Sequence, residues 1–306
     1  MITGNTFFFG WEVRLIEWIQ SWLGPVGTAI ASFITLFGEE YFLVAILGFL
    51  YWCWDKEFGE YMGLNIVTGI VWNPLIKNIF LRRRPYFDNP GIKCLKPVDS
   101  GADIMDIGAQ GFSFPSGHST NSAITFGGLA AYKKTRALWI LAFVAPLLVG
   151  ISRFSVGVHY PTDVICGWLL GVAIILLLSF LQKKIEKRWL LHLIIFVISC
   201  AGLFYCRTND YFSGLGLMAG FFLAIEFEPR FVKFETTRNV VAIILRMIGG
   251  FIVYLGLNAL LKLPFSKEFL HSATMGAYLI RVLRYTIVSF VSIGVYPMVF
   301  RFRPFK

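Results

Sequence analysis

Long apolar runs alternate with short polar or charged segments along the chain. A helix needs about 20 apolar residues to cross the hydrocarbon core of a bilayer, so the shorter runs must draw on flanking residues. The expected spans are residues 41–54, 61–81, 119–132, 137–151, 160–181, 189–206, 211–225, 240–261 and 278–300. This pattern predicts an all-α, polytopic membrane bundle of about nine transmembrane helices.

The N-terminal segment has a different pattern. Large apolar residues recur there at helical spacing, with polar residues around them: Trp11, Leu15, Trp18 and Trp22. Such a stripe predicts a helix that lies in the membrane interface. The alternative is that these residues form the first turns of a tilted span that continues through residues 28–37. Gly24 and Pro25 break the run in either case.

Composition supports a membrane protein, because hydrophobic residues make up 57% of the chain and charged residues only 15%. The net charge of +10 does not indicate nucleic-acid binding, since the basic residues stand in short loops and no soluble domain remains to hold a duplex. The cysteines lack the spacing of zinc ligands, although a bridge between Cys94 and Cys206 stays open. We expect one domain, in which residues 1–185 form the N-terminal helix and a catalytic core and residues 186–306 add transmembrane helices packed on it.

One polar stretch, residues 152–163, reads SRFSVGVHYPTD and stands between two apolar runs. If a helix starts near Tyr160, His159 and Asp163 are at i and i+4 on one face, so the carboxylate can hold the imidazole in one tautomer. Arg153 follows the preceding run and can reach the same place. Ionisable groups are costly in lipid and are kept mainly for function, so this stretch is a candidate site.

A second stretch, residues 77–85, reads KNIFLRRRP and ends another apolar run. Lys77 and Arg84 are seven residues apart, which is two helical turns, so they are expected to share a face. Pro85 disfavours the helical conformation of the residue before it and should push Arg84 out of the helix.

A third stretch, residues 112–121, reads FSFPSGHSTN and opens an apolar run. Ser116 and Gly117 offer backbone N–H groups at the start of a predicted helix, where anions are attracted. His118 stands beside them. Together, the three stretches could bind and react with a phosphate group. They supply two cations, an anion-binding turn with a histidine, and an Arg–His–Asp set.

In this order the three stretches resemble the signature motifs of the type 2 phosphatidic acid phosphatase superfamily, K-x6-R-P, P-S-G-H and S-R-x5-H-x3-D. That superfamily also contains glucose-6-phosphatase, the sphingosine-1-phosphate phosphatases and the vanadium haloperoxidases. The resemblance covers about residues 41–181 and implies a haloperoxidase-like catalytic core. Every motif position is filled: Lys77, Arg84, Pro85, Pro115, Ser116, Gly117, His118, Ser152, Arg153, His159 and Asp163.

The residues predict phosphate-ester hydrolysis, and the resemblance implies the same roles. His159, oriented by Asp163, is the expected nucleophile, which would form a phosphohistidine, and His118 is the expected acid for the leaving oxygen. The phosphate would be bound by cations and helix-terminal N–H groups, those of Lys77, Arg84, Ser116, Gly117 and Arg153. No metal or other cofactor is expected, because these side chains supply the positive charge that Mg²⁺ would supply and the acidic residues of a hard-cation site are missing.

We expect an integral-membrane, metal-independent phosphatase whose substrate is a lipid phosphate monoester or diphosphate. The alternatives are a lipid phosphotransferase, a glucose-6-phosphatase-like sugar phosphatase and, outside enzymes, a catalytically silent lipid-binding relative or a transporter. The resemblance favours a lipid, since the residue matched by Asp163 is absent from glucose-6-phosphatase. The expected partners are the phosphorylated substrate and membrane lipids, with no nucleic acid; the sequence leaves the oligomeric state open.

Basic residues gather in the loops on the side opposite to the motifs. Because basic loops stay in the cytoplasm, we expect an extracytoplasmic active site and a cytoplasmic C-terminus.

Other charged residues are expected to be structural. Arg82 and Arg83 are interpreted as ordinary interface charges. Three acidic residues are assigned to a solvated loop: Asp99, Asp103 and Asp106. Three arginines within apolar runs are expected to snorkel or to pack against helix ends: Arg246, Arg281 and Arg284. For Arg281 and Arg284, the alternative is that one of them lines the substrate entrance.

Overall fold

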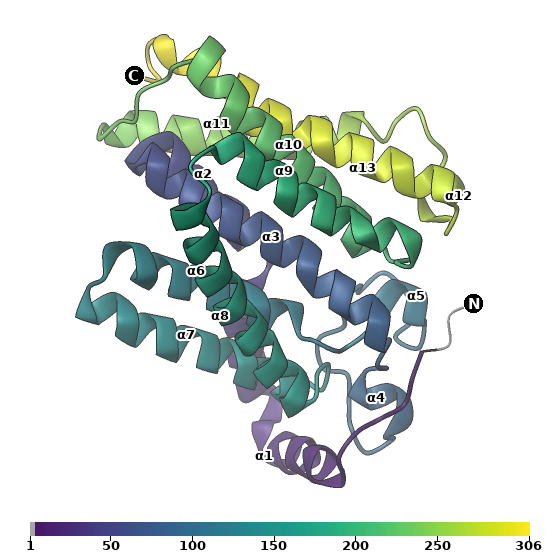
Figure 1. The fold of residues 1–306 in the computed structure, drawn as a ribbon. Coiled ribbons are helices and arrows are strands. Elements are labelled where there is room, and N and C mark those ends of the chain that lie inside the picture. The colour runs from purple at the N-terminus through teal and green to yellow at the C-terminus, as the bar shows by residue number, and fades with distance from the viewer. Residues whose placement is uncertain (1–3) are drawn as a thin grey trace. The chain divides into compact units, whose positions relative to one another are not determined.

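The computed structural model describes residues 4–306, which form helices joined by loops, with one isolated bridge between Asn5 and Arg82. The α-helices are α1 (Gly10–Ile34), α2 (Glu40–Gly48), α3 (Lys56–Phe80), α4 (Pro85–Asp88), α5 (Ile107–Gln110), α6 (Gly117–Lys133), α7 (Arg136–Ser155), α8 (Pro161–Lys184), α9 (Arg188–Ser199), α10 (Asn209–Phe231), α11 (Val240–Leu260), α12 (Lys267–His271) and α13 (Met275–Phe290). Short turns extend several of them: η1 (Thr35–Gly38), η2 (Phe49–Trp54), η3 (Cys200–Phe204), η4 (Val291–Val295) and η5 (Tyr296–Arg301). The all-α class is confirmed for this part of the chain (Figure 1).

Within the described residues, 6 helical stretches are long and apolar enough to cross a membrane. They are Gly10–Gly38, Arg136–Ser155, Pro161–Lys184, Asn209–Phe231, Val240–Leu260 and Met275–Arg301. Glu40–Trp54 and Arg188–Phe204 are apolar but shorter. The chain is thus a membrane bundle, and five of these stretches coincide with spans that were expected from the runs. The sixth, Gly10–Gly38, is the N-terminal segment, for which a tilted span was the alternative to an interfacial helix.

Two further predicted spans, residues 61–81 and 119–132, are absent from both groups; their helices, α3 and α6, carry polar side chains, and α6 has only 17 residues. The fold buries these side chains rather than exposing them to lipid. On α6 they are Ser119, Thr120, Ser122 and Thr125. Asn73 of α3 donates a hydrogen bond to Thr120 Oγ1 at 2.9 Å, which joins the two helices. The helices that carry two of the three motifs are therefore held by polar contacts, which low-polarity lipid strengthens.

The chain divides into two compact units. The first comprises the described residues up to Leu43 together with Trp72–Leu177, and the second comprises Val44–Val71 and Leu178–Lys306. All motif residues belong to the first unit. The grouping of residues 1–185 and 186–306 into one domain stays a prediction.

In the first unit, α1 changes direction at Gly24, whose backbone has φ 56° and ψ 179° and is followed by Pro25 (Figure 1). This is the predicted break, and glycine allows it because it has no Cβ. Trp18 and Trp22 on the N-terminal half are 63% and 79% exposed, whereas Ile16 is fully buried. One face of this half-helix thus packs inward while the tryptophans face away.

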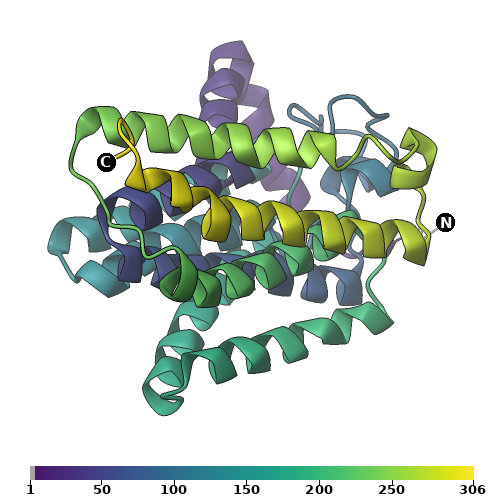
Figure 2. The same ribbon diagram turned by 90° about the horizontal axis from the view of Figure 1, so that it is seen from above.

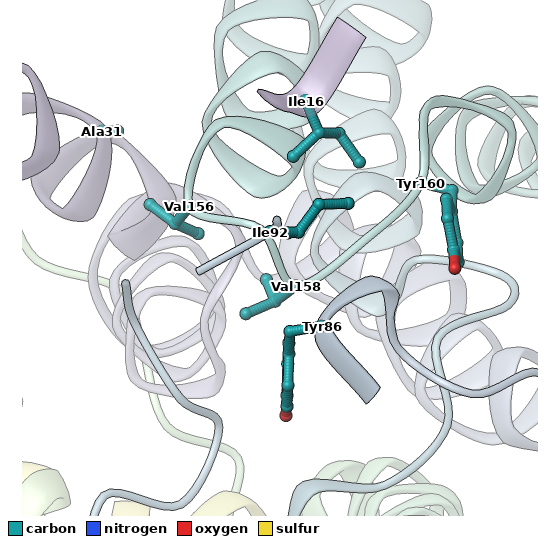
Figure 3. Packing of buried hydrophobic residues seen from close by; sticks show 7 residues of the cluster. All are labelled: Ile16, Ala31, Tyr86, Ile92, Val156, Val158 and Tyr160. Carbon is teal, nitrogen blue, oxygen red and sulfur yellow. The ribbon is translucent and has the colours of Figure 1, made fainter. Parts of the chain in front are cut away.

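The inward face of α1 packs on the segment that precedes α8. Figure 3 shows the buried cluster that results, with side chains from α1, α4, the following loop and the chain just before α8. Its members are Ile16, Ala31, Tyr86, Ile92, Val156, Val158 and Tyr160. Burial of a large apolar side chain stabilises a fold by about 1.5–3 kcal/mol, so this cluster fixes the position of the backbone on either side of His159.

In the second unit, α10 and α13 pack closely, and Figure 2 shows α13 also running beside α11. Arg246 of α11 is buried and donates to the carbonyls of Trp52, Glu235 and Phe305. Arg284 is buried and donates to Asn258 Oδ1 at 2.8 Å. Packing of these two arginines is thus confirmed, and an entrance role for Arg281 or Arg284 stays a prediction. Cys94 and Cys206, for which a bridge was open, are both free thiols.

The close approach of α10 and α13 depends on glycine. A Cβ at Gly220 would lie 2.3 Å from the carbonyl oxygen of Thr286, whereas a Cβ at Gly256 on α11 would have no atom within 4 Å. Overpacking typically costs about 1–3 kcal/mol, and an unhindered glycine-to-alanine change in a helix gains about 0.5–1 kcal/mol. We expect Gly220→Ala to lower the Tm in detergent and Gly256→Ala to leave it unchanged or raise it. Equal effects of the two variants would contradict this packing.

Candidate active site

Lys77 occupies the last turn of α3, and the chain leaves the helix directly afterwards. The helix ends at Phe80, and Leu81 takes a positive φ of 51° that turns the backbone. Arg84 follows in an extended conformation as the residue before α4, whose first position is Pro85. The expectation that Lys77 and Arg84 share one helix face is therefore wrong, because α3 stops between them, although Pro85 does hold Arg84 outside a helix as predicted.

Arg84 is buried and its guanidinium is oriented by backbone carbonyls. Nε donates to Gln110 O at 2.8 Å and Nη1 donates to Val158 O at 2.9 Å. Nη1 also lies 3.4 Å from Nε2 of His159. Hydrogen bonds to carbonyls fix the direction of the guanidinium without neutralising its charge, so a positive charge stands beside this imidazole nitrogen.

Ser116 caps α6 with its own hydroxyl, which accepts from the N–H of Ser119 at 3.4 Å. Its backbone N–H donates to the carbonyl oxygen of Asp163 at 2.9 Å, which ties the start of α6 to the start of α8. The N–H groups of Gly117 and His118 are in the first turn of α6, where a helix has no internal acceptors for them. The predicted helix start is thus confirmed, and anion binding by this turn stays a prediction.

Arg153 lies in the last turn of α7 and is buried. Nη1 donates to Thr35 Oγ1 at 2.5 Å, whereas Nε has no hydrogen-bond partner among the described residues. A buried, unsatisfied charged donor is costly unless a ligand uses it. The side chain is therefore held at one nitrogen and available at another.

His159 follows a turn made by Gly157, which has φ 78°. It is 2% exposed, and its Nδ1 lies 3.5 Å from Asp163 Oδ2, just beyond hydrogen-bond distance. Burial, and then the positive charges of Arg84 and Arg153, hold the pKa of His159 well below its usual value. The imidazole is therefore neutral at all pH values above that lowered pKa, and a neutral ring has a nitrogen lone pair with which to attack.

The geometry therefore brings the three predicted stretches together at one place in the first unit. A search of known families gave two matches, the PAP2 superfamily over residues 58–187 and the transmembrane extension of PAP2 superfamily phosphatases over residues 212–304. The chain is 32% identical over 192 residues to an undecaprenyl-diphosphatase of Sulfolobus acidocaldarius, which covers 61% of this chain and 84% of the relative. The chain belongs to the PAP2 superfamily.

A curated relative and a solved structure with lower coverage of this chain were also found. Phosphatidylglycerophosphatase B of Bacillus subtilis is 31% identical over 184 residues, 55% of this chain and 79% of the relative. A solved transmembrane PAP2-type phosphatidylglycerolphosphate phosphatase from Bacillus subtilis aligns with a TM-score of 0.44 and 28% identity, over 58% of this chain and 86% of that chain. The named homologues of this PAP2 protein are phosphatases of phosphate monoester or diphosphate bonds, which confirms the enzyme class that the motifs predicted.

Arg82 is the main residue that the sequence interpretation missed. Expected at an interface, it is 1% exposed and pairs with Asp163 Oδ1 at 2.7 Å and with Glu12 Oε2 at 2.9 Å. The interpretation was wrong because both partners are far away in the sequence. The available signal was Glu12 itself, a lone carboxylate beside a stripe of tryptophans. Arg83 is closer to expectation, as a partly exposed side chain that pairs with Asp88 at 2.8 Å.

Glu39 was also missed. It pairs with Lys96 at 2.8 Å, and its Oε1 lies 4.0 Å from Nε2 of His118. The neighbouring His118, and then Lys96, lower the pKa of Glu39 to about 2, so this carboxylate is ionised at neutral pH. A carboxylate beside the expected acid can hold its ring in place.

The acidic loop behaves as predicted. Asp99, Asp103 and Asp106 are exposed, and each accepts a backbone N–H from two residues further along the chain. Their carboxylates thus shape the loop itself.

The unsatisfied donor of Arg153 gives a test of phosphate binding. Inorganic phosphate or vanadate should raise the Tm of the purified protein, since a ligand at about 100 times its Kd adds about 2.7 kcal/mol to the folded state. Arg153→Gln should lose most of this shift, whereas Arg83→Gln should keep it because Arg83 pairs only on a partly exposed surface. Equal shifts in the two variants would exclude a phosphate site at Arg153.

Proposed function

We propose that this protein is an integral-membrane lipid phosphatase that acts through a covalent phosphohistidine at His159. The observation that carries the proposal is the placement of a buried, neutral His159 whose Nε2 faces Arg84 while its Nδ1 faces Asp163. A neutral nitrogen beside a fixed positive charge is what attack on a phosphate anion requires, because the charge draws in the phosphate and the lone pair forms the bond.

The first step forms a bond from His159 Nε2 to phosphorus as the bond from phosphorus to the leaving oxygen breaks. The proton on Nδ1 stays on the ring and faces Asp163, which balances the positive charge that the ring gains. His118 donates a proton to the leaving oxygen. In the second step His118 takes a proton from water, the water oxygen attacks phosphorus, and Nε2 is released with its lone pair.

Cationic side chains and N–H groups hold the phosphate in this proposal. Arg153 offers its unpartnered Nε, Arg84 its guanidinium beside His159, and Lys77 a charge that also acts on the His159 ring. The N–H groups in the first turn of α6 complete the set. These donors supply the charge stabilisation for which other phosphatases use a metal, and we propose that the reaction needs none.

A lipid is the proposed substrate. By their names, relatives act on undecaprenyl diphosphate, on phosphatidylglycerophosphate and on lipid A. A phosphotransferase would share the first step and pass the phosphoryl group to another headgroup instead of water. A silent relative or a transporter is less well supported, since every motif position is filled and the charged residues converge on one imidazole.

We further propose that the active site faces the extracytoplasmic side, that the C-terminus is cytoplasmic and that the chain crosses the membrane about nine times, with α3 and α6 as polar, protein-enclosed crossings. The distribution of basic residues supports this orientation.

Substrate and metal requirement are tested together. Purified protein should release phosphate from phosphatidic acid, sphingosine-1-phosphate, undecaprenyl diphosphate or phosphatidylglycerol phosphate more efficiently than from glucose-6-phosphate. EDTA should leave this activity unchanged and vanadate should inhibit it. Activity that is lost on chelation and restored by Mg²⁺ would overturn the mechanism, and a preference for glucose-6-phosphate would overturn the substrate class.

The two histidines are separated by the leaving group. His159→Ala should abolish phosphoenzyme formation and turnover on every substrate. His118→Ala should lose about 10²–10⁴-fold on a lipid alkoxide but much less on an activated aryl phosphate, which leaves without a proton. Equal losses of His118→Ala on both substrates would show that it binds phosphate instead, and a phosphohistidine trapped in His159→Ala would overturn the assignment.

Orientation is tested by labelling intact cells with an impermeant thiol reagent. The variants carry one cysteine each, at Asp103 or at Lys184, in a chain whose native cysteines are replaced. The cysteine at Asp103 should react from outside and the one at Lys184 only after permeabilisation. The reverse pattern would refute the proposed orientation.

A further inference from the structure

We propose that Arg82 and Glu12 are positioning residues for the Asp163–His159 pair, so that the N-terminal helix α1 is a working part of the active site. The proposal rests on the phosphohistidine mechanism proposed above. It follows from a buried chain of contacts that begins on α1 and ends at the imidazole.

Arg82 is held on all sides of its guanidinium. Nη1 donates to Asp163 Oδ1 at 2.7 Å and to Thr162 Oγ1 at 2.8 Å. Nη2 donates to Glu12 Oε2 at 2.9 Å, and Nε donates to the carbonyl oxygen of Phe7 at 2.7 Å. A side chain with its three nitrogens engaged has one orientation, and a planar guanidinium transmits that orientation to its partners.

Two aromatic rings add to this restraint. The guanidinium carbon lies 4.0 Å from the ring centre of Tyr160 and 4.7 Å from that of Phe7. Stacking of this kind favours a desolvated guanidinium. Arg82 is consequently shielded from solvent, and its bonds to carboxylates act in a medium that weakens them little.

Glu12 anchors the other end of the chain of contacts and is fully buried. Oε2 accepts the N–H of Phe9 at 2.9 Å in addition to Arg82. Oε1 accepts from Thr162, from its hydroxyl at 2.6 Å and from its N–H at 3.1 Å. Glu12 thus holds Arg82, which lies two residues before Arg84, and Thr162, which directly precedes Asp163.

Asp163 receives this restraint and passes it to His159. Oδ1 is occupied by Arg82, and Oδ2 accepts the N–H of Tyr160 at 2.7 Å. The carboxylate plane is thereby fixed, with Oδ2 3.5 Å from Nδ1 of His159. Nδ1 has no hydrogen-bond partner among the described residues. Oδ2 of Asp163 is therefore an acceptor toward which Nδ1 can turn during the reaction, and Arg82 fixes the position of that acceptor.

The charges explain why a second carboxylate is present. Arg82 with Asp163 alone would be a neutral pair, whereas Arg82 with Asp163 and Glu12 carries one net negative charge. That charge stands on the Nδ1 side of His159, opposite to the Nε2 that faces Arg84, where it would stabilise the positive charge that the ring gains on phosphorylation.

The test uses Glu12→Gln, with Asp88→Asn as the matched control, since both convert the carboxylate partner of an arginine in the same run into an amide. Glu12→Gln should lower kcat and the rate of phosphohistidine formation about tenfold. This is the low end of the effects known for residues that orient the ligands of a metal site through hydrogen bonds. KM and the Tm shift given by phosphate should stay as in the parent, because the phosphate ligands are untouched. Glu12→Asp, which keeps the charge, should retain more activity, and Asp88→Asn should match the parent.

A double-mutant cycle shows whether Glu12 acts through Asp163. In an Asp163→Asn background, Glu12→Gln should cost less than about twofold, because interacting residues are not additive. The full loss in both backgrounds would overturn the proposal, as would a lower Tm with unchanged kcat per folded molecule, which is the behaviour of a merely structural contact. If Glu12→Gln does not fold, Thr162→Val takes its place, because it removes the hydroxyl that links Glu12 to Arg82. The expected losses are the same, and the double-mutant cycle is made with Thr162→Val and Asp163→Asn.

The variants distinguish a failure of this inference from a failure of the proposed function on which it rests. Loss of turnover in His159→Ala with normal kcat in Glu12→Gln and Thr162→Val would refute only the positioning role. Turnover that survives in His159→Ala would refute the phosphohistidine mechanism itself.

Discussion

Asp163 connects the three motif stretches of the first unit by ordinary hydrogen bonds. Its backbone carbonyl accepts from Ser116 at the start of α6, and its carboxylate accepts from Arg82 after α3 and from the N–H of Tyr160 before α8. Each of these bonds is buried, where an unpaired partner would be costly. The site therefore depends on one residue that meets the polar requirements of three chain segments at once.

The buried arginines differ in what satisfies them, and this difference separates their roles. Arg82 pairs with two carboxylates, so its charge is consumed inside the protein. Arg84 is directed by carbonyls and Arg153 by a hydroxyl, and these acceptors orient a guanidinium without neutralising it. Their fields also explain why His159 is neutral, since a positive ring beside two positive guanidinium groups in a buried site is unfavourable. Arg82, whose charge is paired, and Arg84, which we propose binds the phosphate, stand only two residues apart in the chain.

The membrane adds a second constraint, which the helices meet in two ways. In α7, α8 and α11 only 28%, 33% and 22% of the apolar window is buried inside the protein, which leaves apolar surface for lipid contact. By contrast, α3 and α6 bury asparagine, serine and threonine and bond to each other through Asn73 and Thr120. Polar helices of this kind can exist in a bilayer only when protein surrounds their polar groups. The enclosure of these polar groups is what allows us to propose α3 and α6 as crossings.

The sequence by itself determined the helical membrane class, the family and the motif residues, because apolar runs and fixed motif spacings are local properties that need no knowledge of contacts. It also located the break at Gly24 and the helix starts near Ser116 and Tyr160, where capping and φ preferences act within a few residues; in the structure these helices begin at Gly117 and Pro161. Only the tertiary structure decided which arginine of the run 82–84 serves which partner, since Glu12 lies 70 residues before Arg82 and Asp163 lies 81 residues after it. Such pairs leave no periodic signal in the chain, and Arg82 is buried only because α1 and the first turn of α8 both pack on the segment that follows α3.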